Sequence, residues 1–246
     1  MASSHPYKGV NFFMKILFWG KNFLFPGACA LCGGSLIDPL EVHYSLCNDC
    51  RFALLPAQGN KCSFCGKPLV SEIGTCLPCR NSENHSYDRL WVIFPYTGKY
   101  RDLLTAYKFK KNLSIAGFLA EKINEVLTNE PLLKDTVIVP VPPRPGKIKE
   151  TGWDQVDYLV KKLKKISGNI VVKKCLKRTK SKIQKSLNRK ERIENLKGRI
   201  GINGAAPKNV LIIDDVITTG STMEVNAQVL KNAGTEKVYG LCLFYD

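Results

Sequence analysis

Beyond residue 86, hydrophobic positions recur at two different spacings along the chain. Short apolar or β-branched runs predict strands, whereas apolar residues three and four positions apart predict helices. The predicted strands are Arg89–Tyr96, Thr136–Val141, Asn169–Leu176, Val210–Ile213 and Val238–Tyr245. The predicted helices are Lys99–Tyr107, Leu113–Leu127, Gln155–Ile166 and Ser221–Asn232. This alternation predicts an α/β domain, a Rossmann-like parallel sheet with helices on both faces.

A strongly apolar segment, Asn11–Phe25, precedes this pattern. Lys15 and Lys21 interrupt it, and no run approaches the roughly 20 apolar residues that a membrane-spanning helix needs. We therefore predict an amphipathic helix within residues 1–25 that packs on the protein itself, and no transmembrane segment. Attachment to a membrane surface or a partner is the alternative.

Cysteines dominate the region between these two parts. Eight of the ten form four C-x-x-C pairs: Cys29/Cys32, Cys47/Cys50, Cys62/Cys65 and Cys76/Cys79. Two such pairs supply the four thiolates of a tetrahedral zinc site, so residues 26–80 are predicted to form a double zinc-ribbon domain with two structural zinc ions. A disulfide framework of a secreted protein is the competing interpretation, whereas a zinc protein is expected in the reducing cytoplasm.

The order of the pairs favours one grouping. A glycine follows the first and third pairs but not the second and fourth, so the sequence repeats one unit twice. This favours sequential sites, with the first four cysteines on one zinc ion and the last four on the other. A cross-braced pairing remains open.

The positive charge is concentrated in one segment. Lys161–Arg199 holds sixteen Lys and Arg residues and two acidic residues, which accounts for +14 of the net +16. Such a segment suits a polyanionic partner, either a phosphate-rich substrate or nucleic acid.

The candidate chemistry lies in VLIIDDVITTGST, Val210–Thr222. A buried strand leads into Asp214 and Asp215, whose carboxylates can hold ribose hydroxyls or Mg²⁺. The loop that follows offers backbone N–H groups, hydroxyls and a glycine at the start of a helix, which together form a cradle for a phosphate. A strand–turn–helix without a ligand is the alternative.

This segment resembles the ribose-phosphate signature of type I phosphoribosyltransferases, which use phosphoribosyl pyrophosphate (PRPP) with Mg²⁺. Almost the whole chain resembles the ComF family of competence proteins. Besides the cysteine pairs, the similarity rests on Tyr96–Leu104, Tyr107–Phe109, Pro140–Pro142, Gly152–Gln155, Arg178, Thr179, Gln184, Arg192 and Asn195. The resemblance implies a type I phosphoribosyltransferase-like domain over residues 86–246, after the zinc-ribbon domain.

The resemblance also implies roles for individual residues. Asp214 and Asp215 would hold the ribose hydroxyls as catalytic residues, and Thr218, Thr219, Gly220, Ser221 and Thr222 would bind the 5′-phosphate. The pyrophosphate and flexible-loop residues would be Pro142, Pro143, Arg144, Gln155, Arg178, Gln184 and Arg192. The family usually has an arginine where Thr151 stands, so Arg144, Lys147 or Lys149 is a candidate for the missing cation.

The resemblance implies a phosphoribosyltransferase-like protein that acts in DNA uptake and natural transformation, where incoming single-stranded DNA is processed. Its expected partners are PRPP, single-stranded DNA and other competence or recombination proteins. The alternative is a non-catalytic accessory protein that binds PRPP or single-stranded DNA.

Overall fold

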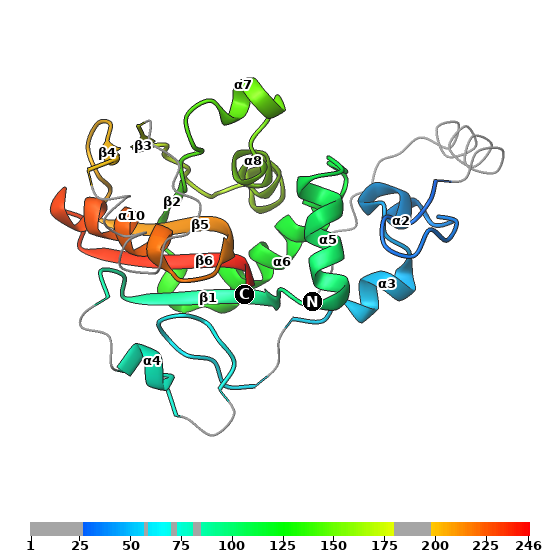
Figure 1. Cartoon of the computed structure of the whole chain (residues 1–246), viewed down its shortest axis with the longest axis horizontal. Coiled ribbons are helices and arrows are strands. Elements are labelled where there is room, and N and C mark those ends of the chain that lie inside the picture. The colour runs from blue at the N-terminus through cyan, green and yellow to red at the C-terminus, as the bar shows by residue number, and fades with distance from the viewer. Residues whose placement is uncertain (1–26, 57–58, 70–72, 81–84, 180–197) are drawn as a thin grey trace.

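A computed structural model describes residues 27–56, 59–69, 73–80, 85–179 and 198–246. Its central feature is a parallel sheet of four strands in the order β1-β6-β5-β2 (Figure 1). The strands are β1 (Arg89–Pro95), β2 (Val137–Pro140), β5 (Asn209–Ile217) and β6 (Lys237–Tyr245). The parallel α/β fold predicted from the sequence is confirmed.

Helices cover both faces of this sheet because successive strand residues point to opposite sides. On β5, Leu211 and Ile213 pack with α5, α6 and α8, while Val210 and Ile212 pack with α10. With both faces buried, the strand reads as an uninterrupted apolar run. The helices of this part of the chain are α5 (Gly98–Lys108), α6 (Ile115–Asn129), α7 (Lys147–Thr151), α8 (Gln155–Ser167) and α10 (Ser221–Asn232), with a 3₁₀ turn η1 (Pro131–Leu133).

One predicted strand differs from the structure. Asn169–Leu176 is extended but forms only an isolated bridge, in which Val172 lies beside Ile138 of β2. Pro140 ends β2 and has no N–H to donate, so pairing along this edge stops early. The chain then forms β3 (Leu176–Arg178), which pairs with β4 (Ile200–Ile202) in a separate antiparallel sheet.

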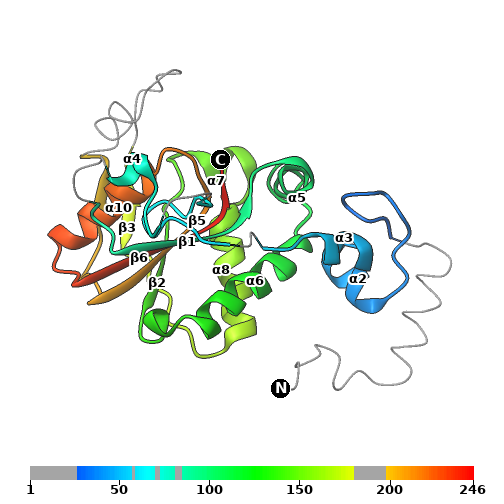
Figure 2. The same ribbon diagram turned by 90° about the horizontal axis from the view of Figure 1, so that it is seen from below.

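The two cysteine-rich units contact different parts of the α/β domain. The first ribbon, residues 27–56, contains α2 (Pro39–Tyr44) and α3 (Asn48–Ala53) and lies beside α5 and α6 (Figure 2). Its Tyr44 is fully buried, packs edge-on against Phe118 at 6.2 Å between ring centroids and donates a hydrogen bond to Glu121. The first ribbon is therefore part of the main hydrophobic core.

The second ribbon, residues 59–69 and 73–80, contains α4 (Leu77–Arg80) and lies along β1, which is an edge strand (Figure 1). Leu90 N–H donates to the Ser63 carbonyl at 2.9 Å, and Lys61 Nζ donates to the Val92 carbonyl at 2.9 Å. The buried residues of this ribbon, Cys62, Cys76 and Cys79, form a small cluster of their own.

The N-terminal segment 1–25 lies outside the described residues. No helix in the part of the chain that the structure describes is long and apolar enough to cross a membrane.

Candidate functional site

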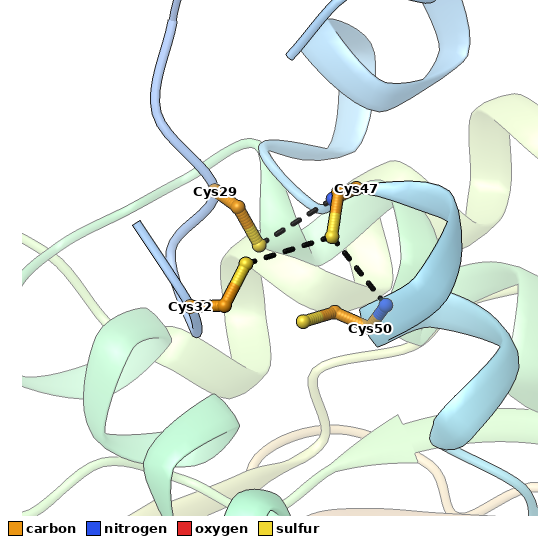
Figure 3. A group of neighbouring side chains, drawn as sticks. All are labelled: Cys29, Cys32, Cys47 and Cys50. Atoms are coloured by element: carbon orange, nitrogen blue, oxygen red, sulfur yellow. Dashed lines mark hydrogen bonds between the residues drawn. The ribbon is translucent and has the colours of Figure 1, made fainter. Parts of the chain in front are cut away.

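Eight cysteines gather in two groups of four. The first group is Cys29, Cys32, Cys47 and Cys50, and the second is Cys62, Cys65, Cys76 and Cys79. Within each group the sulfur atoms lie within 4.8 Å of one another. Figure 3 shows the four thiols of the first group converging from a loop and the start of α3. The sequential grouping favoured by the sequence is confirmed.

The spacing of the sulfur atoms fits zinc. The Sγ–Sγ distance is 3.7 Å between Cys32 and Cys47 and also between Cys65 and Cys76. Four thiolates at about 2.3 Å from a tetrahedral zinc ion lie about 3.8 Å apart. The two four-cysteine clusters therefore support two structural zinc sites, and all ten cysteines are free of disulfides.

The first cysteine of each group has a lowered pKa, which favours the thiolate form that binds zinc. Burial raises the pKa of Cys29, but the backbone N–H groups of Cys32 and Cys47 outweigh this effect and lower it to about 7. The pKa of Cys62 is likewise lowered to about 7, because N–H groups of Cys76 and Cys65 outweigh its burial. In both sites the first cysteine therefore has a lowered thiol pKa.

A second cluster of chemical groups lies at the carboxyl end of the sheet. β5 carries Asp214 and Asp215 and continues to Ile217, four residues beyond the predicted end of the strand. Asp215 is buried, and its Oδ2 atom accepts from Gln155 Nε2 at 2.7 Å and lies 2.8 Å from Lys108 Nζ. Lys108 comes from the last turn of α5 and Gln155 is the first residue of α8, so three elements meet at this carboxylate.

The two carboxyl groups have opposite electrostatic environments. Burial and the neighbouring Asp215 carboxylate raise the pKa of Asp214 well above its usual range. Burial also raises the pKa of Asp215, but the Lys108 ammonium outweighs it, and the net pKa is lowered. Asp215 is therefore a carboxylate with a resident cation, whereas Asp214 favours the protonated form until a cation approaches it.

A polar network holds Gln155 in place. Lys147 Nζ donates to Asp154 Oδ2 at 2.6 Å and also to the Gln155 side-chain oxygen. Asp154 caps α8 by accepting from Asp157 N–H at 2.9 Å, and Tyr107 O–H donates to the Gln155 carbonyl at 2.6 Å. Since the Gln155 oxygen is occupied by Lys147, its amide nitrogen is directed to Asp215.

The predicted phosphate loop follows β5 directly. Thr218 and Thr219 are in the loop, Gly220 precedes α10, and Ser221 and Thr222 are its first residues. Gly220 has φ 76°, a left-handed conformation that favours glycine, and it offers no side chain to cap the helix. The Thr219 and Ser221 hydroxyls lie 2.8 Å apart. The first turn of α10 thus presents backbone N–H groups and hydroxyls, the arrangement that binds phosphate.

The other predicted residues are distributed unequally. Pro142 and Pro143 follow β2, and Arg144 on the same loop is paired with Glu150, its Nη1 at 2.8 Å from Oε1. Burial lowers the pKa of Arg178, and the nearby Asp214 carboxyl opposes this shift, so β3 brings a guanidinium toward the acid pair. Gln184 and Arg192 lie outside the described residues.

Comparisons with known proteins match both parts of the chain. A double zinc ribbon domain matches residues 21–80, and a phosphoribosyl transferase domain matches residues 155–246. The DNA utilization protein YhgH of Salmonella typhi is 30% identical over 89% of this chain and 96% of its own length. The competence protein ComFC of Streptococcus pneumoniae is 27% identical over 85% of this chain and 96% of its own. The chain belongs to the ComF family.

The relation to solved structures is more distant. A hypoxanthine phosphoribosyltransferase from Staphylococcus aureus is 15% identical, with a TM-score of 0.33 over 53% of this chain and 63% of its own. For this ComF-family chain, the phosphoribosyltransferase-like fold therefore depends on the sheet itself and on the domain match.

The sequence did not single out Lys108. It belongs to the YKF segment that carries part of the resemblance to the ComF family, but it lies outside both matched domains. Its contact with Asp215 joins residues 107 positions apart, and no local pattern reports such a pair. Its place in the YKF segment, at the end of α5, was the one available signal.

Proposed function

We propose that this protein binds PRPP with Mg²⁺ at the carboxyl end of β5 and acts as a phosphoribosyltransferase-like protein in DNA uptake. The observation that carries the proposal is the continuous run from Asp214 and Asp215 through Thr218–Gly220 into the first turn of α10. It joins ribose-binding carboxylates to a phosphate cradle within one strand–loop–helix unit. The role in DNA uptake comes from the competence and DNA utilization proteins to which the chain is related.

In this proposal each group has a defined task. The Thr218–Thr222 loop holds the 5′-phosphate, and the acid pair orients the ribose hydroxyls, directly or through Mg²⁺. Pro142, Pro143 and Arg144 lie on the loop that would face the pyrophosphate, and Arg178, Gln184 and Arg192 belong to the segment that would cover it. Mg²⁺ would neutralise charge on the departing pyrophosphate.

Lys108 and Gln155 are positioning residues in this scheme. Together they hold Asp215 Oδ2, while Val216 N–H donates to Oδ1 at 3.0 Å, so both oxygens of this carboxylate are fixed beside Asp214. Holding the ribose in one orientation lowers the entropic cost of reaching the reacting geometry.

Calorimetric titration with PRPP and Mg²⁺ tests the binding site. We expect saturable binding that the Asp214→Asn, Asp215→Asn double variant weakens at least about 100-fold, because hydrogen bonds to charged groups contribute about 1.5–3 kcal/mol each. Unchanged binding by the double variant would overturn the site. Release of pyrophosphate on adding candidate bases then distinguishes an enzyme from a non-catalytic PRPP-binding protein.

Single-stranded DNA binding is a second candidate function, which the exposed lysines near α8 favour. Lys164 and Lys165 lie in the last turn of α8, and Lys173 and Lys177 follow the helix, all exposed to solvent. Contacts between these ammonium groups and phosphates would release counterions, so the logarithm of the binding constant should fall linearly with the logarithm of salt concentration. A flat response, or an unchanged slope in a Lys164→Glu, Lys165→Glu variant, would count against this surface.

A further inference from the structure

The second ribbon and the phosphate loop enclose one cavity. This cavity of about 240 Å³ has Thr218–Gly220 on one side and Cys65, Lys67, Cys76 and Cys79 on the other. Lys67 forms no ion pair with any residue that the structure describes, although it lines the same cavity as the loop predicted to hold a phosphate. The ribbon thus adds a cation to the surroundings of that loop.

A chain of contacts also joins the ribbon to the helix behind the loop. The Phe64 ring, between Cys62 and Cys65, stacks on His85 at 4.7 Å between centroids. His85 Nδ1 lies 3.6 Å from Glu224 Oε2, and Ser86 N–H donates to Glu224 Oε1 at 3.0 Å. Glu224 belongs to the first turn of α10, the turn that would bind the phosphate. A displacement of the second ribbon would therefore be transmitted to this turn through the side chains of Phe64, His85 and Glu224.

The first ribbon has no such connection. No residue of 27–56 lines the cavity, and its contacts are made with α5 and α6, on the other face of the sheet from α10. The two cysteine sites therefore form a matched pair within one molecule.

We propose that the second ribbon is part of the phosphoribosyl site, so that metal binding at Cys62, Cys65, Cys76 and Cys79 and ligand binding at the phosphate loop strengthen each other. Metal binding by the first ribbon is then independent of ligand binding at the phosphate loop. This inference rests on the proposed PRPP site and adds a residue, Lys67, and a partner site to it.

The physical reason is the small size of the second ribbon. Its buried cluster consists of three cysteines with Phe64, Cys65 and Leu69 packed against them, which is too little apolar surface to hold a fold without metal. The metal-bound ribbon supplies the cavity wall and Lys67, and the metal-free ribbon does not. A ligand that contacts this wall must bind the metal-loaded form more tightly, and linkage makes the effect reciprocal.

Zinc release from the full-length protein tests the proposal. A zinc-chelating dye is added with Mg²⁺ alone or with Mg²⁺ and saturating PRPP. We expect PRPP to slow the release of one of the two zinc ions at least about fivefold, the lower end of typical coupling, and to leave the other unchanged. Calorimetry on the same sample reports PRPP binding separately. If PRPP binds and neither zinc ion is protected, or both are protected equally, the inference is wrong. If PRPP does not bind, the proposed function fails and the inference with it.

Variants identify which zinc ion is protected and which residues couple it to the phosphate loop. The Cys29→Ser, Cys32→Ser variant should keep the protected zinc, whereas the Cys76→Ser, Cys79→Ser variant should keep only the unprotected one. His85→Ala and Lys67→Ala leave all eight cysteines in place, so both should still bind two zinc ions. We expect His85→Ala to lose most of the protection and Lys67→Ala to bind PRPP several-fold more weakly. Full protection of the zinc ion in His85→Ala together with full PRPP affinity in Lys67→Ala would overturn the coupling through these residues. This result can be read even if a cysteine variant does not fold.

Discussion

The two cysteine ribbons each have four cysteines in two C-x-x-C pairs and the same 3.7 Å sulfur separation, yet they contact different neighbours. The first contributes Tyr44, Leu46 and Leu54, all fully buried, to the main hydrophobic core. The second has its own small cluster and lies between an edge strand and the candidate phosphate loop. Two similar cysteine clusters thus have different surroundings, and the packing around each one distinguishes them.

Removal of the first zinc site should have the largest effect on stability. A Cys47→Ser, Cys50→Ser variant loses the metal that holds Tyr44, Leu46 and Leu54 in the core, and each such side chain contributes about 1.5–3 kcal/mol. We expect its Tm to lie at least about 10 °C below that of a Cys76→Ser, Cys79→Ser variant, since 1 kcal/mol shifts Tm by about 2–4 °C at this size. Thermal unfolding followed by circular dichroism, with one zinc ion confirmed per chain, measures the difference. Equal Tm values would contradict the comparison.

Tyr44 tests the first ribbon without removing a zinc ligand. Tyr44→Ala should lower the free energy of unfolding by about 3–5 kcal/mol, because it leaves a cavity against Phe118. Tyr44→Phe removes only the hydrogen bond to Glu121 and should cost about 1 kcal/mol. Denaturant unfolding measures both values, and both variants should still bind two zinc ions. A cost for Tyr44→Ala no greater than that for Tyr44→Phe would show that the ring is not a core residue.

The glycines that follow the first pair of each ribbon provide a smaller, matched test. Gly33 has φ 75° and Gly66 has φ 68°, so an alanine at either position is strained by about 1–2 kcal/mol. At Gly33 the added methyl group meets nothing within 4 Å, whereas at Gly66 it would lie 2.2 Å from Val92 Cγ2. Gly66→Ala should therefore cost about 1–3 kcal/mol more than Gly33→Ala in denaturant unfolding. Equal costs would show that the second ribbon is not docked on β1.

The smallest expected effect is the pH dependence of ligand binding, which distinguishes the contribution of the acid pair from that of the second ribbon. The pKa of Asp214 is raised in the free protein, and a bound cation favours its carboxylate, so ligand binding with Mg²⁺ should release a proton. Affinity should then rise with pH below that raised pKa, by at most tenfold per unit. Calorimetry in two buffers of different ionisation enthalpy measures the proton. Asp214→Asn, which binds the same titrating ligand, should lose this release, while Lys67→Ala should keep it. Equal release by Asp214→Asn and the unmodified protein would assign the proton to another group.

Much of the fold could be predicted from local patterns. Ser221–Asn232 is a helix with the predicted bounds, and the cysteine grouping followed from a glycine repeat. Asn169–Leu176 could not be predicted correctly, because its β-branched residues favour an extended strand while its neighbour β2 offers only a short edge ending at Pro140. Pairing depends on the partner strand, which no local pattern reports.

The candidate site was predicted as a list of residues but not as a network. The sequence marked Asp214, Asp215 and Gln155, whereas the contacts of Lys108 and Lys147 depend on how α5, α7, α8 and β5 meet in the fold. The opposite pKa shifts of the two adjacent acids arise from this arrangement, since their sequence context is nearly the same.

Two hydrogen bonds between β1 and the second ribbon also bear on self-association of this chain. Leu90 of β1 donates one to the ribbon, and Lys61 of the ribbon donates the other to β1. β1 is the last strand on its side of the sheet, and unpaired backbone groups on an edge strand invite pairing with another molecule. The ribbon occupies the Leu90 N–H and the Val92 carbonyl and places Gly66 directly against Val92. A cysteine cluster that ends 139 residues before Thr218 in the sequence thereby belongs to a ribbon that blocks pairing of this edge with another molecule.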